Sequence, residues 1–378
     1  MHIKEKLAAI DWGNTIFILG YHLALIIGLP FYYLSHSPAK GLYLVAALLV
    51  YLPGLAISIG YHRLYSHKTF KTHPVIETIL LFFGSLATQG SAIKWGFEHR
   101  HHHAYVDTDK DPYSIKKGFL FAHILWMFKK AKPIDKKVVA DLYANKLLAF
   151  QHRFYAPIML ITNILVTLLL GYLFNDYLGS LIICWGIRLF FLHHFTWFIN
   201  SAAHTWGSQS ISKEHSAVNN YILSFFTFGE GYHNYHHTFA NDYRVGARWY
   251  QFDPGKWIIW LLSRFHLTRD LKRANYYRVK EKMLKVRTEE IKKMIKNSMP
   301  TQAHILEKKV EAGIQKIQDQ IQEIRSLITK YQIYKKDRMS SEKIRSLKLK
   351  IKEAKKGIKR ECKEWNSLSR SILHTKTT

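Results

Sequence analysis

The sequence contains very little cysteine. Its 378 residues include only Cys184 and Cys362. Cys184 falls in an apolar run and Cys362 in a basic one, so we expect no structural disulfide, and a disulfide-stapled scaffold and a cysteine-based zinc site are both excluded. The cysteine set of an iron–sulfur cluster, the CxxCH motif of haem attachment and the HExxH motif of zinc hydrolases are missing as well. Chemistry based on these groups is therefore not expected.

Acidic residues are scarce too, and no leader sequence is apparent. There are 27 Asp and Glu against 55 Lys and Arg, which gives a formal net charge of +28. The first residues, MHIKEKLAAIDWGN, have no small-residue cleavage site after a short apolar core, so no cleavable signal peptide is predicted. Apolar runs concentrate before Asn200 and basic residues in the last third. This split predicts a membrane-embedded domain, residues 1–266, and a basic helical tail, residues 267–378.

Four apolar runs approach the length of a membrane span, which is about 20 residues for a helix. They are Thr15–Leu34, Leu42–Tyr61, Ala156–Phe174 and Tyr177–Asn200. A fifth run, Pro74–Ile93, contains Glu77 and Gln89 and is predicted to be a buried or re-entrant helix. Buried core helices of a soluble protein are the alternative, but four runs of this length are unusual in soluble chains.

The distribution of lysine and arginine predicts how the spans are oriented. The short links Ser35–Lys40 and Asn175–Asp176 hold one lysine between them, whereas the segments on the opposite side are rich in Lys and Arg. The positive-inside rule then places both termini, residues 61–155 and everything after Asn200 in the cytoplasm. We expect an integral membrane protein with its functional face toward the cytoplasm, in a bacterial inner membrane rather than the endoplasmic reticulum.

Histidine is the residue that the sequence has in excess, with 22 copies. Many of them fall in four clusters, HRLYSH (His62–His67), HRHHH (His99–His103), NSAAH (Asn200–His204) and HNYHH (His233–His237). All four clusters lie on the cytoplasmic side of the predicted topology, although they are distant in sequence. Packing alone does not explain such a convergence, whereas histidines outside the clusters are expected to be structural.

The spacing within two clusters favours metal ligation. Residues three and four apart share a face of a helix, so His99, His102 and His103 can point at one centre, while His101 faces away and is not predicted to be a ligand. The same offsets recur at His233, His236 and His237.

The other two clusters contribute further candidates. His62 and His67 are five apart, about 140° around an α-helix, so they can straddle a metal ion. His204 follows Asn200 by four and faces the same way. Nine imidazoles and one amide exceed the four to six ligands that one ion takes, which predicts two metal ions, and imidazole suits iron, copper and zinc. A metal cluster that caps apolar helices implies a hydrophobic substrate.

The four motifs resemble those of the membrane fatty-acid desaturases of the stearoyl-CoA (acyl-CoA delta-nine) type. The family pattern is H-R-L-W-S-H, H-R-x-H-H, N-S-x-x-H and H-N-Y-H-H, and this chain reads HRLYSH, HRHHH, NSAAH and HNYHH. The flanking segments DPYSIKKGFLFAHILW and GEGYHNYHHTF, the latter followed by DYR, match as well. The resemblance covers roughly residues 10–266.

The resemblance implies an all-α membrane protein with four transmembrane helices and a cytoplasmic, histidine-rich cap that holds a non-haem di-iron centre. It implies that Asn200 reaches one iron through water. It implies as iron ligands His62, His67, His99, His102, His103, His204, His233, His236 and His237.

The implied activity is the oxygen-dependent insertion of a cis double bond, at the delta-nine position, into a long-chain saturated acyl-CoA. Dioxygen is the co-substrate, and two electrons come from outside, because the chain has no haem or iron–sulfur module of its own. An external donor of the cytochrome or ferredoxin type is therefore expected, steered by the basic cytoplasmic face. Membrane lipid is an expected partner, and nucleic acid is not.

The chain departs from the family pattern at two places. It reads WGFEHR where the animal acyl-CoA enzymes read W-x-R-D-H-R, so Phe97 and Glu98 replace a pair associated with the CoA headgroup. Tyr65 replaces the tryptophan of the first motif. An acyl-lipid desaturase and a fatty-acid hydroxylase on the same scaffold remain alternatives, and a metal transporter or sensor is less favoured. The loop Asp107–Tyr113 supplies either acceptors for ligand N–H groups or a solvated turn.

The basic tail shows two heptad-like apolar seams that predict a coiled coil. The first seam is Val310, Ile314, Ile317, Ile321, Ile324, Ile328 and Tyr331, and the second is Ile344, Leu347, Ile351, Ala354 and Ile358. The break at Lys335–Ser341 predicts an antiparallel helical hairpin, and self-association through a dimerising coil is the alternative. The tail suits either anionic lipid headgroups or a role as a solvated basic helix with no specific partner.

Overall fold

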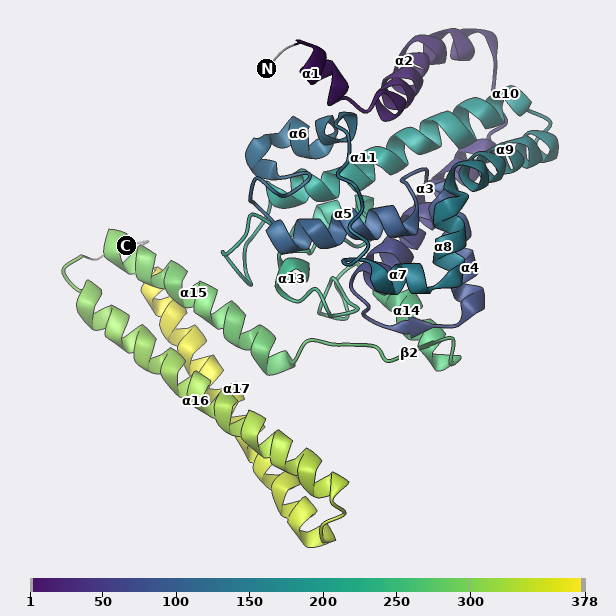
Figure 1. The fold of residues 1–378 in the computed structure, drawn as a ribbon. Coiled ribbons are helices and arrows are strands. Elements are labelled where there is room, and N and C mark those ends of the chain that lie inside the picture. Colours follow the sequence, from purple (N-terminus) through teal and green to yellow (C-terminus); the bar gives the residue numbers. More distant parts are fainter. Residues whose placement is uncertain (1–2, 299, 375–378) are drawn as a thin grey trace. The chain divides into compact units, whose positions relative to one another are not determined.

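The computed structural model describes residues 3–298 and 300–374 (Figure 1). The chain divides into two units, each with its own hydrophobic core. The first unit contains the residues up to Gln209 together with Glu214–Arg273, and the second contains Ser210–Lys213 and the residues from Ala274 onward.

Four helical segments of the first unit are long and apolar enough to cross a membrane, which supports an integral membrane protein. They are α2 (Trp12–Ser35); α3 (Gly41–Ala56) with the π-helix η1 (Ile57–Ser66); α9 (Tyr155–Leu173); and the run of α10 (Tyr177–Gly179), the π-helix η4 (Ser180–Ile187), α11 (Arg188–Asn200) and η5 (Ala202–His204). The four predicted apolar runs are thereby confirmed as helices. The fifth run is the shorter apolar helix α4 (Pro74–Leu86).

Local sequence signals explain where several of these helices begin. The Asp11 side chain accepts a hydrogen bond from the backbone N–H of Asn14 and so caps α2. Helix α5 (Ala92–Tyr105) begins after Ser91, whose hydroxyl oxygen accepts from Lys94 N–H. Helix α5 follows α4 after a buried turn. Its histidines therefore lie near the ends of the membrane-spanning helices.

Short elements complete the first unit around α5. They are α1 (Ile3–Ala8), η2 (Ile115–Lys117), α6 (Phe119–His123), η3 (Leu125–Phe128), α7 (Ala140–Ala144), α8 (Lys146–Arg153), α12 (Tyr221–Phe226), α13 (His233–Thr238) and α14 (Pro254–Arg264). Strand β1 (Lys71–Thr72) pairs antiparallel with β2 (Thr268–Arg269), with Lys71 opposite Arg269. This pairing ties the segment after η1 to the segment after α14.

The second unit consists of three helices, α15 (Tyr276–Ser298), α16 (Ala303–Lys336) and α17 (Ser341–His374). Helices α16 and α17 are antiparallel, because Trp365 packs beside Gly313 and Gln320 beside Gly357. The first predicted seam is buried from Val310 to Ile324. The sequence analysis did not expect α15 to join this core, but its apolar residues pack there, which makes a three-helix arrangement rather than a hairpin alone.

Candidate metal centre

The first two candidate ligands lie at the end of a π-helix. The backbone N–H of His67 donates to the carbonyl of His62 (3.1 Å), the five-residue step of a π-turn. This step brings the two rings to a centroid distance of 4.9 Å. The expectation of an α-helical separation of about 140° therefore does not apply, because η1 is wound more widely than an α-helix.

Nine histidines form two groups of potential ligand atoms, and within each group these nitrogen atoms lie within 4.8 Å of one another. The first histidine group consists of His62, His67, His99, His103 and His236. The second histidine group consists of His102, His204, His233 and His237. These are the nine histidines that the sequence analysis selected, and His101 belongs to neither group.

The expectation that His99, His102 and His103 point at one centre is wrong. His99 and His103 belong to the first group, whereas His102 belongs to the second. Residues four apart on an α-helix differ by only about 40° in direction, but adjacent residues differ by about 100°. Helix α5 therefore serves both groups, with His99 and His103 in the first and His102 in the second, and α13 beside it does the same (Figure 1).

The nitrogen atoms of the first group stand at the spacing of ligands around one ion. The Nε2 atom of His236 lies 2.9 Å from Nε2 of His62 and 3.0 Å from Nε2 of His103. Nε2 of His67 lies 2.8 Å from Nε2 of His99. Adjacent ligands at right angles, each about 2.1 Å from a metal, are about 3 Å apart. The donor set therefore fits a metal ion.

The second group has a similar geometry. Nε2 of His237 lies 3.1 Å from Nε2 of His233 and 3.3 Å from Nε2 of His102. The buried Nε2 atom of His204 has no hydrogen-bond partner among the described residues. An orphaned buried nitrogen is costly unless something unseen occupies its lone pair, so this group fits a metal ion as well.

Burial favours the neutral form, which is the form that binds metal, for most of the nine imidazoles. Burial first, and the other imidazoles second, lower the pKa well below its usual range for His67, His99, His103, His233, His236 and His237.

Three ligands have acidic or hydroxyl partners on the other ring nitrogen. Nδ1 of His102 lies 2.9 Å from a carboxylate oxygen of Asp111. Nδ1 of His204 lies 2.7 Å from Oγ of Ser216, which in turn donates to Asp107 (2.5 Å). Such contacts fix the tautomer and leave Nε2 free for a metal. The expectation that the loop Asp107–Tyr113 supplies acceptors for ligand N–H groups is confirmed for Asp111, whereas Asp107 reaches His204 only through Ser216.

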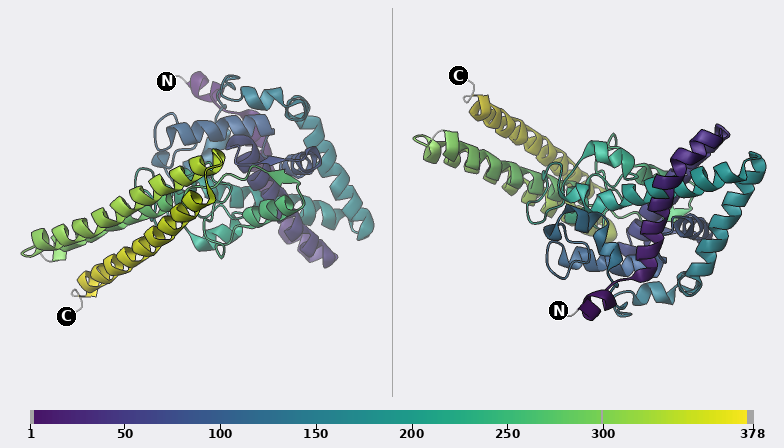
Figure 2. Two further views of the ribbon diagram at one scale, coloured as in Figure 1. Left: turned by 90° about the horizontal axis from the view of Figure 1, so that it is seen from below. Right: turned by 90° about the horizontal axis from the view of Figure 1, so that it is seen from above.

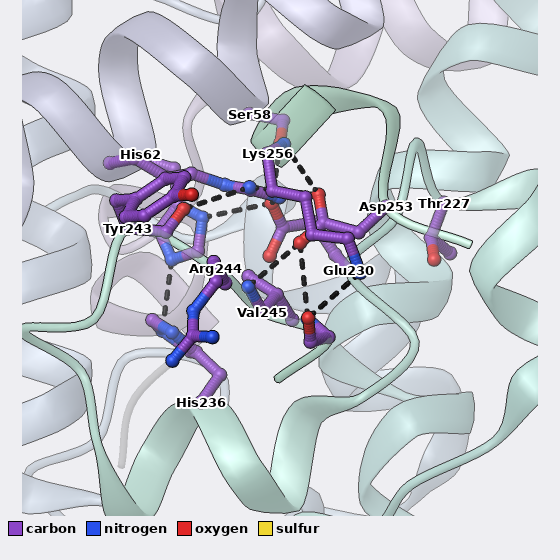
Figure 3. A network of polar contacts seen from close by, with 12 residues as sticks. Ser58, His62, Thr227, Glu230, His236, Tyr243, Arg244, Val245, Asp253 and Lys256 are labelled. Atoms are coloured by element: carbon purple, nitrogen blue, oxygen red, sulfur yellow. Dashed lines mark hydrogen bonds and ion pairs between the residues drawn. The ribbon is translucent and has the colours of Figure 1, made fainter. Parts of the chain in front are cut away.

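Glu230 is the third partner, and sequence reasoning missed it. Its carboxylate lies 3.1 Å from Nδ1 of His62 and accepts from Ser58 (2.5 Å), two residues that Figure 3 labels. It also accepts from Arg63 (2.9 Å). Burial by itself would raise the pKa of Glu230, but His62 and Arg63 outweigh it and hold that pKa at about 2. The only signal in the sequence was its place in GEGYHNYHH.

A second carboxylate completes this buried network. Arg63 also pairs with Asp253 (2.8 Å), which is fully buried. Asp253 accepts three backbone N–H groups, from Val245, Gly246 and Lys256, at 2.9 to 3.1 Å (Figure 3). The network fixes η1 against the segment around α13 and α14. It therefore fixes the ligands of the first histidine group that come from η1 relative to the one that comes from α13.

One cavity of about 710 Å³ borders both histidine groups. Asn200 lines it beside His102 and His233. Span residues such as Ile57 and Met159 supply an apolar part of its wall. Its lysines come from α5 and from the segments beside η2 and η3, and they are Lys94, Lys110, Lys117, Lys129, Lys130 and Lys132.

Much of this chain is similar in sequence to known proteins. Residues 38–269 match the family model described as fatty acid desaturase. A probable acyl-CoA desaturase of Schizosaccharomyces pombe is 42% identical over 71% of this chain and 58% of its own length. Acyl-CoA desaturase 1 of Saccharomyces cerevisiae is 37% identical over 75% of this chain and 56% of its own length. The sn-1 stearoyl-lipid 9-desaturase of Anabaena variabilis is 32% identical over 70% of this chain and 95% of its own length.

The alignments thus span little more than half of the two fungal proteins. The family match, by contrast, covers every candidate ligand from His62 to His237. The chain belongs to the fatty acid desaturase family.

Proposed function

We propose that this protein is an oxygen-dependent desaturase that places a cis double bond, at the delta-nine position, in a long-chain saturated acyl-CoA. The observation that carries the proposal is the single cavity that joins two buried histidine groups to an apolar wall and to several lysines. The fungal relatives, named as acyl-CoA desaturases, support this substrate class.

In this proposal each histidine group holds one iron ion, and Asn200 reaches the second ion through water. A non-haem iron pair supplies, from dioxygen and two external electrons, an oxidant strong enough for an unactivated methylene chain. Glu230, Asp111 and Ser216 keep the ligating imidazoles in one tautomer and orientation.

The other residues of the cavity position the substrate. The span residues of the cavity wall exclude water and hold an acyl chain beside the histidine groups, so that one pair of carbons is presented repeatedly. The lysines of the cavity suit the phosphates of a CoA thioester, because ammonium groups pair well with phosphate oxygens.

For the acyl carrier, the structure and the relatives suggest one specific alternative. Buried Phe97 and half-buried Glu98 line the cavity. Lys94 lies 4.0 Å from the Glu98 carboxylate, which offsets one favourable charge. The Anabaena relative, named for a stearoyl-lipid substrate, favours an acyl-lipid desaturase as the second candidate. Acyl-CoA is still favoured, because the cavity contains further positive charges for its phosphates, on Lys129, Lys130 and Lys132.

We further propose that the first unit is the catalytic part and that its histidine groups face the cytoplasm. Most of the similar proteins are eukaryotic, which favours the endoplasmic reticulum over the bacterial inner membrane that the sequence analysis preferred. The electron donor in this proposal is an acidic cytochrome or ferredoxin. Self-association through a coiled coil of the tail has less support, because the first seam is buried within the second unit.

The test offers stearoyl-CoA and a stearoyl phospholipid together to the purified, iron-loaded protein with an artificial reductant. Mass spectrometry then locates any double bond in each lipid class. We expect octadecenoyl-CoA with the bond at carbon nine. Turnover of the phospholipid alone would assign the chain to acyl-lipid desaturation, and a hydroxylated product would assign it to the hydroxylases.

A further inference from the structure

The basic tail carries much of its positive charge on one helix. Helix α17 contains eleven Lys and Arg against four Asp and Glu, a net charge of +7, whereas α16 contains seven against four, a net charge of +3. Both helices have 34 residues, so this excess is a property of α17 and not of the tail as a whole.

Six of the cations form one line along α17. They follow one another at offsets of three or four residues, which places them within an arc of about 80° on one side of the helix. All six are exposed, and they are Arg345, Lys348, Lys352, Lys356, Lys359 and Lys363. This line, here called the basic stripe, is about 27 Å long at the rise of an α-helix.

The basic stripe lies on a different side of α17 from the residues that pack in the core. Ile358, Cys362 and Trp365 belong to the hydrophobic core of the second unit, and α17 is the yellow helix of Figure 2. At about 100° per residue, the four acidic residues of α17 fall outside the arc of the stripe. The helix therefore has one apolar side and one side of uniform positive charge.

The acidic residues of the second unit do not neutralise the stripe. Ion pairs join α15 to α16, and they are Lys292 with Glu311, Lys296 with Glu307 and Arg325 with Glu281. In the stripe, only Lys356 pairs with a carboxylate of the described residues, that of Glu353 at 3.0 Å, and such an exposed pair contributes little. Lys348 lies 6.0 Å from the centre of the Tyr331 ring, a contact that leaves its charge uncompensated. Most of the charge of the stripe is therefore available to a partner.

The stripe has little apolar surface beside it. Leu349, which is 57% exposed, is the one large apolar side chain of α17 that is exposed among the described residues. Helices that insert into the surface of a bilayer present Trp, Phe or Leu along one face, but the apolar face of α17 is used in the core of the second unit. The stripe is thus suited to an electrostatic contact and not to insertion.

We propose that the basic stripe docks the second unit onto anionic lipid headgroups of the bilayer that holds the first unit. The second unit continues along the chain from Arg273, so the stripe is tethered to a membrane-embedded domain. Tethering raises the effective concentration of the bilayer surface around the stripe. Clusters of about four to eight Lys and Arg on an amphipathic helix are typical of sites for anionic lipid.

The composition of the stripe favours lipid over an acidic protein as the partner. Five of its six residues are lysine, and protein–protein interfaces contain lysine less often than the rest of the surface does. A lysine ammonium is a compact charge on a flexible stem, so it pairs with phosphate oxygens without a fixed geometry. This suits a layer of mobile headgroups. The proposal does not depend on the desaturase activity.

The first experiment compares the reactivity of lysines within one protein. The full-length protein is placed in nanodiscs of phosphatidylcholine, with or without phosphatidylglycerol, acetylated briefly and analysed by peptide mass spectrometry. The five lysines of the stripe are the reporters, and the internal controls are Lys308, Lys309 and Lys316, which are exposed on α16. Each cation near an anionic surface favours the bound state by about fivefold, so we expect the stripe lysines to react at least about fivefold more slowly in the anionic discs. The control lysines should react at an unchanged rate.

High salt should abolish this protection, because the Debye length falls to about 3 Å at about 1 M salt. Equal reactivity of the stripe in the two kinds of disc would overturn the proposal, and so would equal protection of the control lysines. Protection that appears only when an acidic protein is added to neutral discs would assign the stripe to protein docking instead.

The second experiment tests the position of the charges with two variants of equal net charge. The stripe variant combines Lys348→Gln, Lys352→Gln and Lys359→Gln, and the control variant combines Lys308→Gln, Lys309→Gln and Lys316→Gln. All six side chains are exposed, so both proteins should fold like the wild type. We expect Lys363 to lose its protection in anionic discs in the stripe variant only. Equal loss in both variants would mean that total charge alone governs binding and would refute the stripe.

Discussion

Replacing His236 by alanine tests the assignment of the two histidine groups most sharply. His236 is 2% exposed, and its Nε2 atom lies about equally close to Nε2 of His62 and of His103, at 2.9 and 3.0 Å. It belongs to the first histidine group only. We therefore expect His236→Ala to empty the first group and to leave the second occupied, so that iron falls from about two ions per chain to about one.

The size of the effect follows from the geometry. Losing only an outer partner of a ligand costs about 10- to 100-fold in metal affinity. Losing the ligand itself, which is one of five convergent nitrogens, should lower the metal affinity by about 100-fold or more. This corresponds to about 2.8 kcal/mol of binding free energy. Desaturation should fall below detection, because the proposed reaction uses both ions.

The matched control is His101→Ala in the same run of histidines. His101 belongs to neither group, stacks on Phe97 and approaches Lys132 at 3.5 Å. Iron is counted by emission spectrometry after gel filtration, beside protein concentration. If His101→Ala lost as much iron as His236→Ala, the ligand assignment would be refuted.

Three further outcomes are expected. Asp111→Asn should weaken metal binding by about 10- to 100-fold in competition with a chelator, because His102 loses a carboxylate at 2.9 Å; an unchanged affinity would mean that Asp111 does not orient it. Asp253→Ala should destabilise the first unit by about 3–5 kcal/mol, seen as earlier loss of the monodisperse gel-filtration peak on heating, because Arg63 and three N–H groups lose a buried partner; a wild-type profile would contradict this. A chain that ends at Arg273 should still desaturate within an order of magnitude of the full-length rate, because every candidate ligand precedes that residue; a folded, iron-loaded truncation without turnover would show that the tail takes part.

The spans and the ligand set could be predicted because each depends on local patterns. Apolar runs near 20 residues predicted the four long helices, and repeated offsets of three and four marked six of the nine grouped histidines, those on α5 and α13. Two metal ions were predicted, but which histidine belongs to which group was not, because this depends on the π-helix around His62 and on the rotation of α5.

Partners brought together by the fold were harder to find. Glu230 meets Ser58 across 172 residues, and His22 meets His194 across the same separation. Each of these side chains looks ordinary in its own segment, so no local pattern marks it. Asp107 and Asp111 were found only because an acidic loop follows the second histidine cluster directly.

The most direct test of the account is the fate of labelled oxygen. The purified, iron-loaded protein is given stearoyl-CoA, a reductant and ¹⁸O₂, and the acyl products are analysed by gas chromatography and mass spectrometry. The proposed function predicts cis-9-octadecenoate without ¹⁸O, because both oxygen atoms leave as water. Hydroxystearate that carries ¹⁸O, or unchanged stearate from a protein with both irons bound, would contradict it.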